Sequence, residues 1–108
     1  MGGSITRSEA GRDVNAADLE QRFRSVGLTP RTFANAPGDT YGAHSHTTHK
    51  ILFCAEGSIT FHTDDGDLEM HAGDRLDLEP DTQHRATVGP DGVVCVEAHA
   101  DGPDALPS

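Results

Sequence analysis

The sequence predicts one all-β domain, a sandwich or a barrel, preceded by a short helix. The chain has 108 residues, which is enough for one domain and too few for two. Its twelve glycines and six prolines recur between short segments in which apolar and polar residues alternate. Frequent turns between short alternating segments are typical of antiparallel β-proteins.

The helix is expected directly after Asn15, which is a good N-cap residue and is followed by acidic residues in the first turn. Leu19, Phe23 and Val26 recur with helical spacing and form one apolar stripe, and Gly27 ends the segment. Because so short a helix is marginal alone, we expect its stripe to dock on a sheet.

The chain is expected to divide into three parts. Residues 1–15 are small and polar without periodicity, which predicts a flexible arm. Residues 16–100 hold the helix and the β-barrel. Residues 101–108 contain two prolines and little that could be buried, which predicts a loose tail.

Short strands separated by turn residues fill the middle of the chain. Asp64, Asp65 and Gly66 indicate a tight hairpin turn, since the acidic residues lack the further ligands of a calcium loop. Within residues 50–55, alternation places residues 50, 52 and 54 on one face and residues 51, 53 and 55 on the other. The expected strands cover residues 31–34, 50–55, 58–63, 68–70, 76–78, 84–88 and 93–98.

Charge and composition exclude several classes of partner. Eight basic and eighteen acidic side chains give a formal net charge of −10, which argues against binding to nucleic acid or to an anionic membrane. No apolar run approaches the roughly 20 residues of a membrane-spanning helix. Two cysteines are too few for a disulfide framework, so we expect a reducing, cytoplasmic setting.

Seven histidines are the feature most suggestive of function. His44 and His46 are separated by one residue, which on a strand places both imidazoles on one face, roughly 6–7 Å apart along the chain. Two imidazoles that enter one cavity can share a metal ion. His62, His71 and His99 are expected to be solvated.

The spacing around the histidines resembles the two motifs of the cupin family, Gly-x5-His-x-His-x3–4-Glu-x6-Gly and Gly-x5-Pro-x-Gly-x2-His-x3-Asn. The resemblance covers residues 31–98 and implies a single-domain antiparallel β-barrel of the double-stranded β-helix or jelly-roll type. The matching positions are Gly38, His44, His46 and Gly57 in the first motif, and Gly73 and His84 in the second.

The resemblance also implies a metal site. In cupins the three histidines and the glutamate usually hold a divalent metal, so His44, His46 and His84 are the expected ligands of a divalent transition metal (Fe, Mn, Ni, Zn or Cu). The glutamate position is occupied by Lys50. Further departures from the motifs are Glu79 and Asp81 at the Pro-x-Gly positions, around Pro80, and Val88 at the asparagine position.

Lys50 leaves four outcomes open. It loses its proton, swings away to pair with an acidic side chain, pairs with the carboxylate of a bound ligand, or marks a site that holds no metal. If a metal is held, we expect Lys50 to be catalytic by holding a substrate carboxylate or enolate. A one-residue shift of register would make His49 a ligand instead. Cys54 is expected to be a small buried hydrophobe, with a sulfur ligand as the alternative.

Two functions follow from the resemblance. The first is a metal-dependent enzyme acting on a small organic acid-like molecule, for example an oxygenase or an isomerase. The second is a module that binds or senses a small ligand without turnover. Fold alone does not choose between them. Small cupins commonly form dimers, so a homodimer is expected.

Overall fold

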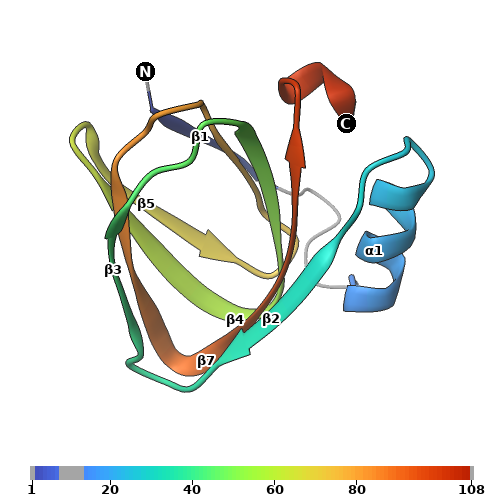
Figure 1. Cartoon of the computed structure of the whole chain (residues 1–108). Helices are drawn as coiled ribbons and strands as arrows, with labels where there is room; N and C mark the ends of the chain where they lie inside the picture. The colour runs from blue at the N-terminus through green and yellow to red at the C-terminus, as the bar shows by residue number, and fades with distance from the viewer. Residues whose placement is uncertain (1, 8–13, 108) are drawn as a thin grey trace.

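The computed structural model describes residues 2–7 and 14–107, and in these ranges one antiparallel seven-stranded sheet curves around an interior to form a barrel (Figure 1). This confirms the expected all-β fold. The strands are β1 (Gly3–Thr6), β2 (Arg31–Asn35), β3 (Thr40–His44), β4 (His49–Thr63), β5 (Gly66–His71), β6 (Arg75–Leu78) and β7 (His84–Ala100), with helix α1 (Ala16–Arg24) and a 3-10 turn at Pro103–Ala105.

β4 and β7 pair with each other over most of their length and form the frame of the barrel. We expected each to be two strands joined by a turn, and this was wrong. Each runs on through its glycines because the register shifts there, between Cys54 and Glu56 and between Gly57 and Ile59. Gly57 has φ +76°, and a Cβ atom at this position would lie 2.0 Å from the carbonyl oxygen of Gly92. Only glycine allows this close approach of the two strands.

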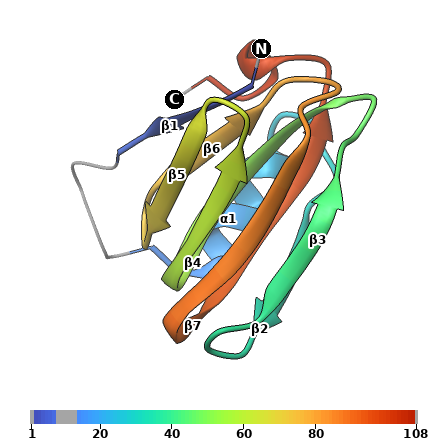
Figure 2. The same ribbon diagram turned by 90° about the vertical axis from the view of Figure 1, so that its left-hand side faces the viewer.

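The sheet has an apolar cluster on each face. Leu52 and Cys54 belong to the inner cluster, whereas Ile51, Phe53 and Ala55 belong to the outer one, as the alternation of this strand predicts. The outer cluster is covered by α1, which lies behind the sheet in Figure 2. The inner cluster surrounds the barrel interior, where the candidate site lies.

Helix α1 begins as expected, since the side chain of Asn15 accepts a hydrogen bond from the backbone N–H of Asp18. Leu19 and Phe23 are fully buried against the sheet. Val26 is 42% exposed, contrary to the predicted stripe, because the helix ends at Arg24. No helix within residues 2–7 and 14–107 is long and apolar enough to cross a membrane.

Within the described residues, both terminal segments make contacts that the sequence did not indicate. Gly3–Thr6, expected in a flexible arm, pair with β6 as strand β1, while residues 8–13 of that arm lie outside the described residues. Leu106, expected in a loose tail, is buried in the outer cluster. Arg75 holds this segment by donating hydrogen bonds to the carbonyl oxygens of Pro103 and Leu106. Both segments depend on partners that lie far away in the sequence.

Candidate metal and ligand site

Three imidazole rings meet at one end of the barrel. His44 is the last residue of β3, His84 is the first of β7, and the two are direct partners in the sheet. His46 follows β3 by two residues. The ring centroid of His44 lies 4.3 Å from that of His84 and 5.1 Å from that of His46. One nitrogen atom from each ring lies within 4.8 Å of the other two.

Backbone carbonyl groups fix the orientation of two of these rings. Nδ1 of His44 lies 2.8 Å from the carbonyl oxygen of Gly42, and Nδ1 of His84 lies 2.9 Å from that of Thr82. A carbonyl oxygen only accepts hydrogen bonds, so each Nδ1 carries the proton. In the neutral rings Nε2 therefore keeps its lone pair, which is the arrangement of a metal-ligating histidine.

His46 is held by Lys50, whose ammonium group donates to Nε2 at 3.3 Å. Desolvation by burial and then the positive charge of Lys50 lower the pKa of His46 to about 4. Desolvation is also the main cause that lowers the pKa of His84. Both rings are therefore neutral at pH 7, as metal binding requires. This set of three imidazole donors fits a divalent transition metal.

Lys50 is paired with an acidic side chain, but it does not swing away from the imidazoles as that outcome supposed, since it also contacts His46. Its Nζ lies 3.2 Å from Oε1 of Glu97, and Oε2 of Glu97 lies 3.2 Å from Nε of Arg31. Lys50 and Glu97 are only 8% and 7% exposed. One carboxylate thus bridges a buried ammonium group and a guanidinium group at the surface.

Glu97 is the residue of the site that the sequence analysis missed. The available signal was its parity, because Val93 and Cys95 on the same strand belong to the inner cluster. A lone carboxylate at the next inward position of an apolar strand indicates a buried partner. That partner, Lys50, comes from a distant strand, so the pair itself could not be read from local sequence.

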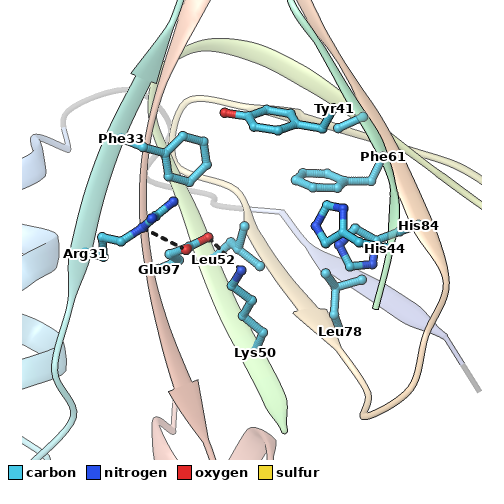
Figure 3. A pocket seen from close by; sticks show the side chains of 11 residues that line it. Arg31, Phe33, Tyr41, His44, Lys50, Leu52, Phe61, Leu78, His84 and Glu97 are labelled. Atoms are coloured by element: carbon cyan, nitrogen blue, oxygen red, sulfur yellow. Dashed lines mark ion pairs between the residues drawn. The ribbon is translucent and has the colours of Figure 1, made fainter. Parts of the chain in front are cut away.

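A small cavity lies between the imidazoles and the ion pairs (Figure 3). Its volume is about 70 Å³, and a second cavity of about 360 Å³ adjoins it at the open end of the barrel. Arg31, Tyr41, His44, Lys50 and Glu97 line both, so they mark the passage between them. The inner cavity is completed by Phe33, Leu52, Phe61, Leu78, His84 and Ala86.

His49 does not belong to this site. It is buried, and its Nε2 lies 2.7 Å from Oδ1 of Asp77. Among the described residues, the one group of side chains that could hold a metal ion includes neither His49 nor Cys54. Cys54 is fully buried, with Sγ directed to the backbone carbonyl of Glu56, as expected of a small hydrophobe.

The remaining histidines divide into two kinds. His62 and His71 pair with Asp67 and Glu69 away from the imidazole cluster. His99 is exposed, as expected. Its ring also lies 5.7 Å from that of His46 and it lines the outer cavity, at the mouth of the site.

Solved structures similar to this chain share its fold at low sequence identity. A protein with a double-stranded β-helix domain from Klebsiella pneumoniae is 22% identical, with a TM-score of 0.61 over 70% of this chain and 69% of that chain. An RmlC-like cupin from Shewanella frigidimarina is 19% identical, with a TM-score of 0.61 over 71% of this chain and 68% of that chain.

A structure of the DMSP lyases RdDddP and RnDddQII is 23% identical, with a TM-score of 0.61 over 71% of this chain and 40% of that chain. No match was found among curated proteins. The cupin domain family matches residues 32–98, which is more than half of the sequence. The three histidines and the barrel around them are thus parts of one recognised domain, and the chain belongs to the cupin family.

Proposed function

We propose that this cupin binds one divalent transition metal through His44, His46 and His84 and holds a small organic acid-like ligand in the adjoining cavity. The observation that carries the proposal is the orientation of the rings. Two Nδ1 atoms are committed to backbone carbonyls, and one nitrogen of each ring lies within 4.8 Å of the others. Fe, Mn, Ni, Zn and Cu all accept imidazole ligands.

A metal held by three imidazoles keeps further coordination positions for other ligands, where it can polarise a carbonyl group, activate water or bind dioxygen. The inner cavity adjoins the imidazoles and is lined mainly by apolar side chains. Such a lining excludes bulk water from a bound molecule and strengthens its polar contacts.

Lys50 is the proposed catalytic residue. Its ammonium group lines both cavities and is buried, so it can hold a carboxylate or an enolate oxygen of the ligand beside the imidazoles. For this contact Lys50 must share its donors with Glu97, which it already binds at 3.2 Å. An ammonium group has three donors, and because Lys50 also donates to Nε2 of His46, one donor is left for the ligand.

Within this function we propose that the protein is an enzyme, an oxygenase or an isomerase. The alternative is a module that binds or senses a small ligand without turnover, and one observation favours it. Lys50 occupies the position of the family's glutamate and donates to Nε2 of His46. A cation at this atom competes with a metal for the same lone pair. The similarity to DMSP lyases, at 23% identity, supports the fold alone.

The test of metal binding is elemental analysis of protein purified without an affinity tag. We expect about one metal per chain in the native protein and loss of that metal in His46→Ala. His71→Ala is the matched control, because His71 lies outside the cluster. Equally low metal content in the native protein and in His46→Ala would refute the metal site. Consumption of a carboxylic acid by the loaded protein, rather than a shift of its melting temperature alone, distinguishes an enzyme from a binder.

We also propose a cytoplasmic homodimer. Free, buried Cys54 and Cys95 are consistent with a reducing compartment. Sedimentation equilibrium of the purified chain measures its oligomeric state, and a monomer at all concentrations would contradict the dimer.

A further inference from the structure

Arg31 offers an unoccupied hydrogen-bonding edge at the mouth of the cavity. Its Nε pairs with Glu97, and its Cζ lies 5.6 Å from the centroid of the Phe33 ring. Among the described residues no hydrogen bond or ion pair is found for its two terminal nitrogens, and the side chain is 71% exposed. Figure 3 shows the guanidinium group between Glu97 and Phe33, at the cavity. A guanidinium group anchored at Nε is preorganised to bind a carboxylate with its other edge.

The charges around the cavity also favour an anion. Arg31 and Lys50 supply two positive charges, whereas Glu97 supplies the one carboxylate of the lining. The lining thus keeps an excess of one positive charge inside a chain whose formal net charge is −10.

The rest of the inner cavity is apolar and small. At about 70 Å³, with about 30 Å³ for each water molecule in the liquid, it has room for about two water molecules, and so only for a small apolar portion of a ligand. The hydroxyl groups of a sugar or the oxygen atoms of inorganic phosphate would lack hydrogen-bond partners along this apolar lining. The apolar side chains that line it are Phe33, Leu52, Phe61, Leu78 and Ala86, together with the ring of Tyr41.

We infer that the ligand is a short aliphatic monocarboxylate, bound with its carboxylate on Arg31 and Lys50, which line both cavities, and its apolar end between Phe61 and Leu52. Arg31 and Glu97 lie on one side of the cavity, and His44 and His84 lie on the other (Figure 3). The carboxylate on Arg31 therefore directs the body of the ligand toward the imidazoles. This inference deepens the proposed function, on which it rests, by naming the ligand class and a residue that recognises it.

The test is calorimetric titration of the metal-free protein with isobutyrate, whose carboxylate would lie at the mouth and whose two methyl groups would enter the inner cavity. We expect isobutyramide, the neutral isostere, and acetate, which lacks two carbon atoms, each to bind roughly tenfold more weakly. Inorganic phosphate should bind no more tightly than acetate. Arg31→Gln should weaken isobutyrate binding by roughly tenfold. Arg24→Gln makes the same change of charge on α1, where Arg24 pairs with Glu20, and should leave binding unchanged.

Three results would overturn the inference. They are no binding of isobutyrate to either metal-free or zinc-loaded protein, equal affinity for isobutyrate and isobutyramide, and equal affinity of Arg31→Gln and the native protein. Because Arg31 is exposed, its substitution should leave the thermal unfolding midpoint close to that of the native protein. Zinc stoichiometry, measured separately, reports on the proposed metal site. Isobutyrate binding without zinc binding would retain this inference and reject the metal site. Zinc binding without isobutyrate binding would retain the metal site and reject this inference.

Discussion

The ammonium group of Lys50 and the carboxylate of Glu97 form a buried ion pair, 3.2 Å long, between β4 and β7. The same ammonium group donates to Nε2 of His46, and the same carboxylate binds Arg31. This pair therefore connects the imidazole cluster to the mouth of the ligand cavity. A substitution of either residue should therefore alter both the imidazole cluster and the mouth of the cavity.

Replacement of Glu97 by glutamine should be costly, because it leaves the charge of Lys50 buried without its ionic partner. We expect the free energy of unfolding to fall by roughly 3 kcal/mol. Arg31→Gln removes the other partner of Glu97 at an exposed position and should cost less than about 1 kcal/mol. Urea denaturation measures both values. Equal losses for the two variants would show that the buried Lys50–Glu97 pair contributes no more to the free energy of unfolding than the exposed Arg31–Glu97 pair.

Lys50→Glu should tighten metal retention, because it removes a cation from His46 and supplies a carboxylate at the position where the family has one. Lys50→Gln is the neutral control and should fall between the native protein and Lys50→Glu. The metal that remains after dialysis against a chelator measures retention. Weaker retention by Lys50→Glu than by the native protein would mean that Lys50 assists the site.

The metal-free protein should lose stability as the pH falls from about 6.5 to about 4. The pKa of His46 is lowered to about 4, chiefly by desolvation and then by the charges of Lys50, His44, His84 and His99, whereas an unfolded histidine titrates near 6.5. Between these values the unfolded chain binds more protons, so acidification favours unfolding. The lowered pKa of His84 acts in the same direction.

A variant isolates the contribution of His46 to this pH dependence. His46→Gln should show a shallower loss of stability between pH 6.5 and 4, and His71→Gln should follow the native curve. Denaturant midpoints recorded across this window measure the effect. Parallel curves for the native protein and His46→Gln would contradict the lowered pKa.

Asp81 stands where the family motif has glycine, and it adopts φ +63°, a left-handed conformation that suits glycine. Its backbone N–H donates to the carbonyl oxygen of His46 at 2.7 Å, so this turn supports the imidazole cluster. Asp81→Gly should raise the free energy of unfolding by roughly 0.5–1 kcal/mol through relief of strain. Asp81→Val should lower it. Loss of stability in the glycine variant would show instead that the aspartate side chain makes a required contact.

Local sequence predicts those features that depend on spacing alone. Alternation in residues 50–55 assigns Leu52 inward and Phe53 outward, and the structure confirms both. The motif spacing names the three histidines that the structure brings together. Each of these inferences needs only the periodicity of a strand or a motif fixed in register.

Features that depend on a distant partner could not be predicted in this way. Gly3–Thr6 is short and has one large apolar residue, Ile5, and it forms a strand by pairing with β6 while Ile5 packs on the inner cluster. Leu106 is buried because Arg75, far away in the sequence, binds the backbone around it. The pairing of Glu97 with Lys50 likewise depends on the register of β4 against β7. This register shifts at the irregular, glycine-containing parts of the two strands, so local sequence does not predict it.

The most direct test of the metal site is to observe the side-chain nitrogens of all seven histidines by NMR while zinc is added to the metal-free, ¹⁵N-labelled protein. We predict that the Nε2 resonances of His44, His46 and His84 change together and saturate at about one zinc per chain. The resonances of His49, His62 and His71 should stay in place. Zinc-dependent changes confined to those other histidines, or no change in the three, would contradict the account.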